Sequence, residues 1–247
     1  MVTEGLAPAL MPAGQRIYAV GDVHGCATRL AALHRAIAED LAARPVAAPL
    51  LVHLGDYIDR GPDSAAVVAR LRHGPPPGLL PGLAAVNLRG NHEAMMLRAL
   101  AAGGDEPALQ WLDNGGAEAL ASWGLSPHAQ AATWRRLLPP GTEAFLAGLP
   151  LWHRVGPYVF VHAGLRPGVA LAAQTPEDMM WIRAPFLGHA GPLGIPDAPG
   201  IVVVHGHTPA PAPVVTAHRI GLDTGAVMGG ALTCGVLEAD RLRFLSA

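Results

Sequence analysis

The 247-residue sequence contains no lysine, because all seventeen of its basic side chains are arginine. This absence excludes catalysis through a lysine Schiff base and phosphate binding by the lysine of a nucleotide-binding loop. Cysteine is also scarce, with only Cys26 and Cys234 in the chain. Two distant cysteines exclude a secreted disulfide framework and favour a reducing, cytoplasmic location.

Long apolar runs and a strong charge of one sign are missing as well. No run approaches the ~18 apolar residues that a membrane-spanning helix needs. The N-terminal "GLAPALMPAG" has no basic start and is broken by Pro8 and Pro12, so we do not expect it to be a signal peptide. The formal net charge is -2 and the pI is about 6.6, which favours neither nucleic acid nor an anionic membrane as a partner.

Apolar residues are abundant, at 51% of the chain, so the sequence can build a sizeable core. The length suits one large domain or two small ones, and no stretch is long enough to be a linker between two. We therefore expect a flexible lead-in over residues 1–15 and a single domain over residues 16–247.

Strand and helix patterns alternate through the first third of the chain. Short apolar runs at Arg16–Val20, Leu50–Leu54 and Leu83–Leu88 predict strands, and each is followed by a helical pattern. This alternation predicts parallel strands flanked by helices. Residues 105–149 are helical in pattern and predict an inserted helical segment. The last third contains short valine-rich runs typical of strands, so the chain as a whole is mixed α/β.

Each predicted strand is followed by polar side chains that can bind metals or phosphate. These residues are Asp22, His24, Asp56, Asp59, Arg60, Asn91, His92, His162, His205 and His207. Sites in sheets with parallel strands form at the carboxyl ends of the strands. We therefore expect these side chains to converge in space although they lie far apart in the sequence.

The donor atoms are carboxylate oxygens, imidazole nitrogens and one amide oxygen. This mixture suits Mn, Fe or Zn better than Ca or Mg, which prefer oxygen ligands alone. Six such groups, including a carboxylate able to bridge, are more economically explained by two ions than by one. Two ions ~3.5–4 Å apart can clamp a phosphoryl group, and they lower the pKa of a bridging water towards ~7.

Five motifs occur in a fixed order: "GDVHG", "GDYIDRG", "GNHE", "HAGL" and "GHTP". Together they resemble the phosphoprotein phosphatase (PPP) family of calcineurin-like metallophosphoesterases. Members of the bacterial and phage type, such as bacteriophage lambda phosphatase, are the most similar in style. The resemblance runs from Ile17 to the final strands, and it implies a central β-sandwich flanked by helices in four layers (α/β/β/α).

The resemblance also implies which residues bind the metals. Asp22, His24 and a bridging Asp56 would hold the first ion. The second ion would be held by Asp56 together with three further ligands, Asn91, His162 and His207. Manganese is the expected metal, with iron and zinc as alternatives.

The remaining motif residues would act on the substrate. Arg60, helped by Asn91, would bind the phosphoryl oxygens, and Arg183 in "MMWIRAPF" would be the second phosphate arginine. Arginine suits this role because its planar fork matches two phosphate oxygens. His92 would protonate the leaving alkoxide while Asp59 orients it, and an acidic partner is expected to raise the pKa of the imidazole and fix its tautomer.

The function implied is a phosphomonoesterase that removes phosphate from protein serine or threonine, and also from tyrosine, by attack of a metal-bridging water. The alternative is a symmetrical bis(5'-nucleosyl)-tetraphosphatase or another small-molecule phosphatase. In the former family the second motif usually lacks the aspartate before the arginine, so Asp59 favours monoester hydrolysis. A non-catalytic scaffold would show missing ligands, and none of the six is missing. The expected partner is a phosphoprotein or phosphopeptide, and the expected state a monomer.

A few residues outside these roles remain open. We expect His53 to be structural and His205 to be a non-ligand, and Asp223 could support the ligands from behind. The segment "WLDNGG", Trp111–Gly116, resembles one found in bacterial relatives. A helix C-cap at Asn114–Gly115 explains its composition equally well.

Overall fold

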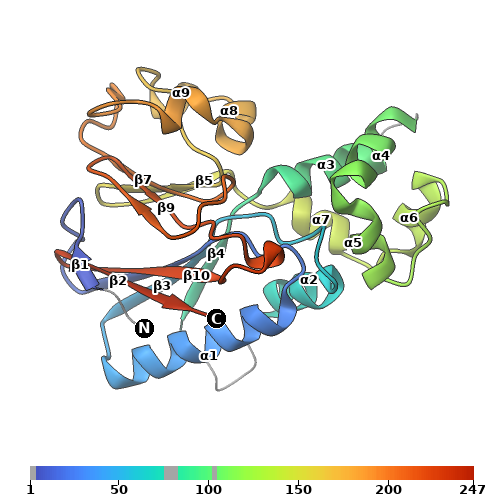
Figure 1. The fold of residues 1–247 in the computed structure, drawn as a ribbon, viewed down its shortest axis with the longest axis horizontal. Helices are drawn as coiled ribbons and strands as arrows, with labels where there is room; N and C mark the ends of the chain where they lie inside the picture. Colours follow the sequence, from blue (N-terminus) through green and yellow to red (C-terminus); the bar gives the residue numbers. More distant parts are fainter. Residues whose placement is uncertain (1–3, 75–82, 102–104) are drawn as a thin grey trace.

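The computed structural model describes residues 4–74, 83–101 and 105–247, and its main feature is a pair of stacked β-sheets (Figure 1). The larger sheet contains, in spatial order, β1 (Glu4–Leu6), β11 (Arg241–Ser246), β10 (Thr233–Glu238), β2 (Gln15–Val20), β3 (Ala48–His53) and β4 (Ala84–Asn87). Strands β2, β3 and β4 are parallel, as the alternating pattern predicts, whereas β1, β10 and β11 pair antiparallel.

The smaller sheet is built entirely from the second half of the chain. It contains, in spatial order, β5 (Trp152–Val155), β6 (Tyr158–Val161), β7 (Val202–His205), β9 (Arg219–Gly221) and β8 (Val214–Val215). Strands β6, β7 and β9 are parallel. All four residues of β6 and of β7 are buried, which explains their continuous apolar sequences.

Helices cover the outer face of each sheet (Figure 1). Helices α1 (Ala27–Ala43) and α2 (Ser64–His73) lie against the larger sheet, and α8 (Pro176–Trp181) and α9 (Ala184–Leu187) lie against the smaller one. Helix α1 buries Leu30, Leu33 and Ile37 at helical spacing. The predicted sandwich of two sheets between helices is therefore confirmed.

A group of helices extends from one side of the sandwich (Figure 1). It consists of α3 (Asn91–Ala101), α4 (Asp105–Trp111), the π-helical turn η1 (Leu112–Gly116), α5 (Ala117–Ser122), α6 (Ala131–Leu137) and α7 (Thr142–Ala147). Most of the segment predicted as a helical insertion lies in this group. Two short 3₁₀ helices, η2 (Leu171–Ala173) and η3 (Ala226–Met228), lie in later loops.

The N-terminal segment differs from its prediction as a flexible lead-in. Residues 4–6 form β1, which pairs antiparallel with β11. Met11 is only 2% exposed, and the Tyr158 hydroxyl bonds to the backbone of Ala9 in both directions. Residues 4–15 thus include a paired strand and a buried side chain where a flexible lead-in was expected, because an open sheet edge and an apolar contact are available to them. Residues 1–3 of that prediction lie outside the described residues.

The core between the two sheets consists of inward-facing aliphatic and aromatic side chains. Ile17 and Val52 of the larger sheet pack in one cluster with Phe160 and Val204 of the smaller sheet, and all four are at most 1% exposed. This cluster fixes how one sheet sits on the other. In the described parts of the chain, no helix is both long and apolar enough to cross a membrane.

Candidate active site

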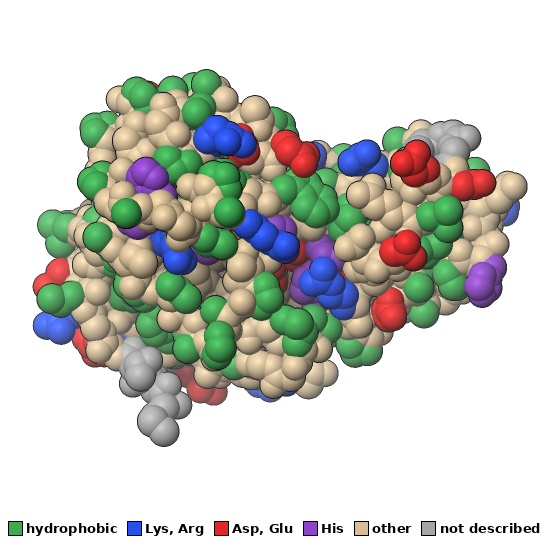
Figure 2. Space-filling view, turned by 45° about the horizontal axis from the view of Figure 1, so that its top comes forward, with side chains coloured by type: hydrophobic (Ala, Val, Ile, Leu, Met, Phe, Trp, Pro, Cys, Tyr) green, Lys and Arg blue, Asp and Glu red, His purple; other side chains and the backbone are tan. Residues whose placement is uncertain are grey.

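The site forms where the carboxyl ends of the parallel strands of both sheets meet. Asp22 follows β2, Asp56 follows β3, and His162 follows β6 directly. Asn91 begins α3 after β4, and His207 comes two residues after β7. Figure 2 shows arginine, histidine and acidic side chains together at a hollow between the sandwich and the helical group. The predicted convergence of these residues is present in the structure.

One cluster of donor atoms surrounds Asn91. His162 Nε2 lies 2.8 Å from Asn91 Oδ1 and 3.4 Å from Asp56 Oδ2, and His207 Nδ1 lies 3.0 Å from Asn91 Oδ1. His162 Nδ1 is 2.9 Å from the carbonyl oxygen of Leu54, so it donates there, and Nε2 offers a lone pair whenever the ring is neutral. A lone pair aimed at two oxygens is an arrangement that a bound cation satisfies.

A second cluster lies on the other side of Asp56. His24 Nδ1 donates to the carbonyl oxygen of Ile58 over 2.9 Å, so its Nε2 faces Asp56 Oδ2 at 3.6 Å. The donor atoms of His24, Asp56 and His92 lie within 4.8 Å of one another, as do those of Asp56, His162 and His207. Asp56 belongs to both triplets, which is the position that a bridging ligand requires.

Asp22 was expected to bind the first metal together with His24 and Asp56, but its carboxylate lies outside the triplet that contains these two residues. Its carboxylate accepts the backbone N–H of His207 over 3.0 and 3.1 Å, and the side chain is buried. A Cβ on Gly206 would lie only 1.9 Å from Asp22 Oδ1, so glycine is required there for close approach. The structure therefore brings Asp22 to the site but places His92, not Asp22, in the triplet with His24 and Asp56.

The pKa values of the buried acidic and histidine side chains are shifted in opposite directions. Burial favours a raised pKa for Asp56, but the imidazoles of His162 and His92 hold it well below its usual range. Burial and the nearby carboxylate of Asp223 raise the pKa of Asp22. Asp56 raises the pKa of His162 to about 10 against the effect of burial. Several carboxylate groups thus lie close together in a buried site. A bound cation would stabilise their negative charge.

His92 and Asp59 form the predicted pair. His92 Nδ1 lies 2.7 Å from Asp59 Oδ2, and Trp111 Nε1 donates to both carboxylate oxygens of Asp59 over 2.9 and 3.0 Å. Burial lowers the pKa of His92 to about 3 and raises the pKa of Asp59. Burial outweighs the opposing effect of the Asp56 carboxylate on His92, and the increase in the pKa of His92 expected from Asp59 is not found.

The two candidate phosphate arginines are exposed beside the buried clusters. Arg60 Nη1 lies 3.0 Å from His24 Nε2, and Arg60 itself is exposed. Arg183 is exposed at the N-terminus of α9. Burial, followed by His162 and to a smaller extent Arg183, lowers the pKa of His207 to about 3. Both guanidinium groups can therefore reach a phosphate at the mouth of the site while the metal-type donors remain buried.

Sequence reasoning missed two buried side chains. Glu93, which ends the motif "GNHE", is fully buried and accepts the N–H groups of Asp56, Tyr57 and Gly90 over 2.8–2.9 Å. It holds the turn that presents Asp56. Trp111 opens the segment "WLDNGG", and only its bond to Asp59 reveals a role in the site. Both residues lie inside motifs that the sequence analysis noted. Their presence in these motifs was the sequence signal that could have identified them as part of the site.

The residues left open by the sequence take clear positions. His53 bonds His34 and Asn87 and lies in no metal-type cluster of the described residues. His205 is buried, with its Nδ1 3.0 Å from the carbonyl oxygen of Gly206, and it is absent from both triplets. Asp223 is 8% exposed and accepts the N–H of Gly225.

Comparison with known proteins agrees with this geometry. Residues 15–237 match the family described as calcineurin-like phosphoesterase. Serine/threonine-protein phosphatase 1 of Salmonella typhimurium is 32% identical over 227 residues, which cover 91% of this chain and 93% of that protein. The asymmetrical bis(5'-nucleosyl)-tetraphosphatase PrpE of Halalkalibacterium halodurans is 26% identical over 240 residues, covering 92% and 91%.

A solved structure shares the fold of this chain. The crystal structure of a candidate diadenosine tetraphosphatase aligns over 96% of both chains with a TM-score of 0.62 and 23% sequence identity. At this identity the likeness concerns the fold, and the family match extends it to the class of chemistry. The chain belongs to the calcineurin-like phosphoesterase family and is a hydrolase of the metallophosphoesterase type.

Proposed function

We propose that this metallophosphoesterase is a phosphomonoesterase that removes phosphate from serine and threonine side chains of proteins, and also from tyrosine. The observation that carries the proposal is the buried hydrogen bond between His92 and Asp59. A serine or threonine leaves as an alkoxide, which is a strong base and needs a proton. The leaving phosphate of a dinucleoside polyphosphate is a much weaker base, so such a substrate needs no paired histidine.

Two divalent metals fit the donor set, because the lone pairs of His24 and His162 converge on Asp56 from opposite clusters. We assign Asp22, His24 and Asp56 to one ion, and Asp56, Asn91, His162 and His207 to the other. Mixed nitrogen and oxygen donors favour manganese, with iron and zinc as alternatives. When bound, such ions supply an activated water and offset the charge of the phosphate.

The protein side chains perform the remaining steps. Arg60, Asn91 and Arg183 bind the phosphoryl oxygens and orient the ester. Asp59 accepts the Nδ1 proton of His92, so Nε2 is the atom that takes up a second proton and, from the imidazolium, gives it to the leaving oxygen. His92 Nε2 lies 3.9 Å from Asp56 Oδ2, which keeps it at the metal-binding centre rather than in solvent.

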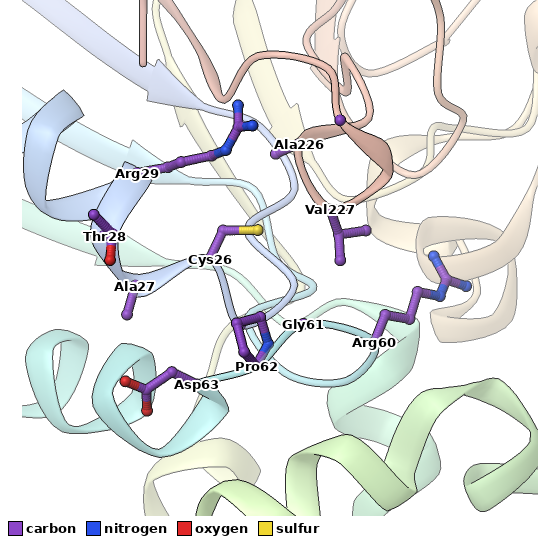
Figure 3. Close-up of a pocket in the computed structure, with 12 residues that line it drawn as sticks. Cys26, Ala27, Thr28, Arg29, Arg60, Gly61, Pro62, Asp63, Ala226 and Val227 are labelled. Carbon is purple, nitrogen blue, oxygen red and sulfur yellow. The ribbon is translucent and has the colours of Figure 1, made fainter.

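A cavity beside Arg60 supports a peptide substrate. It measures about 400 Å³ and lies between the start of α1, the turn after Arg60 and η3 (Figure 3). Its lining combines small or apolar residues such as Cys26, Pro62 and Val227 with the charged Arg29, Arg60 and Asp63, and none of its described lining residues is aromatic. Bases bind well to aromatic side chains, so a lining of small and charged residues without an aromatic ring favours a peptide over a nucleobase.

The proposal is tested by comparing a phosphoserine peptide with diadenosine tetraphosphate as substrates of the manganese-loaded protein. We expect kcat/KM to be higher for the peptide, with p-nitrophenyl phosphate as a control for active enzyme. Asp59→Asn should lower the peptide rate and spare the dinucleotide rate. Much faster cleavage of the dinucleotide by the unmodified protein would overturn the proposal.

The alternative is a symmetrical bis(5'-nucleosyl)-tetraphosphatase or another small-molecule phosphatase. The PrpE relative, described as an asymmetrical bis(5'-nucleosyl)-tetraphosphatase, favours a dinucleotide substrate but not the symmetrical mode of cleavage. The presence of Asp59 and the lining of the cavity count against it. We further propose a monomer in the cytoplasm, without nucleic-acid or membrane partners; the two free cysteines found among the described residues support a reducing compartment.

A further inference from the structure

The turn that carries Asp59 and Arg60 has an unfavourable backbone conformation. Asp59 has a φ of 73° and Arg60 a φ of 65°, both in the left-handed region that non-glycine residues avoid. Two consecutive residues persist in this region only when their surroundings hold them. Asp59 is fully buried, so the contacts that hold it are internal to the protein.

One short segment supplies such contacts to both residues. Trp111, which is also fully buried, donates its indole N–H to the two carboxylate oxygens of Asp59. Four residues later, the carbonyl oxygen of Gly115 accepts the backbone N–H of Arg60 over 3.1 Å. The same segment therefore reaches the partner of His92 and the backbone of the first phosphate arginine.

The two glycines of "WLDNGG" make this double contact possible. Gly115 has a φ of 100°, and a Cβ there would lie 2.6 Å from Arg60 N. A Cβ on Gly116 would lie 2.7 Å from the indole ring of Trp111. The helix widens into a π-helical turn over Leu112–Gly116, a distortion often found at functional sites. The composition is thus not explained by a plain helix C-cap.

We infer that the segment Trp111–Gly116 is the positioning element of the active site, with Trp111 orienting the Asp59–His92 pair and Gly115 placing Arg60. Trp111 is a positioning residue because it touches Asp59, not the substrate. The inference rests on the proposed function of His92 as the proton donor. It adds that one turn of the helical group positions both the residue that donates the proton and the arginine that binds the phosphate.

The Trp111 part is tested with two aryl phosphates. Phenyl phosphate has a strongly basic leaving group that needs a proton, whereas 2,4-dinitrophenyl phosphate has a weakly basic one. Trp111→Phe removes the N–H, so we expect kcat to fall about tenfold or more for phenyl phosphate, within the range of a lost charged hydrogen bond, and far less for the dinitrophenyl ester. An unchanged ratio of the two rates would overturn the inference.

A matched control is available in Trp134, which is also buried and packs edge-on against Trp111 with ring centroids 5.8 Å apart. Its indole donates to the Ser126 carbonyl, remote from Asp59. Trp134→Phe should leave the ratio of the two rates unchanged, and a selective loss there would mean that packing alone is being measured. Circular dichroism and metal content establish that the variants being compared are equally folded.

A double-mutant cycle separates positioning from general damage. If Trp111 acts through Asp59, the variant Asp59→Asn/Trp111→Phe should lose no more phenyl phosphate activity than Asp59→Asn alone. Multiplicative losses would contradict the inference. Because simple aryl esters report on the leaving group, a protein that lacks the proposed preference for phosphoserine would refute the proposed function and still answer this question.

The Gly115 part has its own test, independent of the tryptophan. Gly115→Ala should raise KM severalfold for both esters without changing the ratio of their kcat values, because Arg60 is displaced. Gly124→Ala is the control, since Gly124 has a φ of 72° and no atom within 4 Å of a built Cβ. Equal behaviour of the two alanine variants would overturn the placement of Arg60 by Gly115.

Discussion

Backbone strain is concentrated in the active site at the level of single residues. Among the described residues, six that are not glycine have positive φ, and five of them belong to the predicted site: His24, Asp56, Asp59, Arg60 and His207. Each such conformation costs about 1–2 kcal/mol for a residue with a Cβ. The surrounding hydrogen bonds must offset this cost, so the chain gives up stability to aim these side chains.

His92 is the residue whose role is most open to measurement. It pairs with Asp59 but also lies in the triplet with His24 and Asp56. If it is the proton donor, His92→Asn should lower kcat for phenyl phosphate by about 10²–10⁴ and leave two metal equivalents bound. Steady-state kinetics and atomic emission on the same sample check both statements.

The control for this variant is His128→Asn, since His128 is exposed in the helical group. It should change neither activity nor metal content. A protein that loses one metal on substitution of His92 would place this side chain among the ligands, and Asp22 would then be the group to reconsider.

At the level of elements, a chain of side-chain bonds connects α1, β3 and β4. His53 Nδ1 lies 2.8 Å from Asn87 Oδ1 and donates to it, so His53 Nε2 accepts from His34 Nε2 at 2.9 Å. The tautomers of both rings are fixed when both are neutral. Burial lowers the pKa of His34 to about 3 and that of His53 to about 4. This link therefore requires two uncharged histidines.

The link predicts how stability depends on pH. Both folded pKa values lie below the ordinary 6.5, so the folded protein binds fewer protons than the unfolded chain below pH 6.5. Stability is fully present above this pH and falls as the pH drops from 6.5 towards 4, by up to about 1.4 kcal/mol per pH unit for each ring. Urea unfolding across this range measures the slope.

His34→Gln isolates the contribution of one ring, because glutamine can still donate to His53 but does not titrate. Below pH 6.5 the free energy of unfolding of the variant should fall less steeply with decreasing pH. The difference in slope should correspond to about one titrating group. His128→Gln, at an exposed position, should keep the slope of the unmodified protein. Identical slopes for all three proteins would mean that these buried rings do not control the pH dependence.

At the level of the whole molecule, the active site depends on how the two sheets are stacked. Asp56 follows a strand of the larger sheet, whereas His162 follows a strand of the smaller one, yet their side chains come within 3.4 Å. The apolar cluster between the sheets sets this distance. Metal binding should therefore be sensitive to substitutions in the core that contact no ligand.

Phe160 tests this connection, since it is fully buried between the sheets. Phe160→Ala should lower the free energy of unfolding by about 3–5 kcal/mol, as large cavities in cores do, and should also weaken metal binding. Denaturant unfolding and metal titration measure the two effects. Trp152→Ala, on the neighbouring strand and 37% exposed, is the control. If Phe160→Ala is destabilised but binds metal with unchanged affinity, the packing between the sheets does not control metal binding.

Much of the fold was predictable because its signals are local. The three parallel strands of the first third follow from short apolar runs, and α1 follows from the spacing of Leu30, Leu33 and Ile37. The stacking of two sheets came only from the resemblance to a family. The N-terminal strand β1 was missed, because its pairing partner β11 lies more than 230 residues away and no local pattern announces it.

The sequence by itself determined the donor types, their order and their places after strands, since these depend on residue identity and short-range pattern. Only the tertiary structure decided which donors share a triplet, that His92 stands beside Asp56, and that Asp22 meets the backbone of His207. It also decided that the indole N–H of Trp111 donates to Asp59 and that burial lowers the pKa of His92. Distances between remote segments and the loss of water around a charge arise only when the chain is packed.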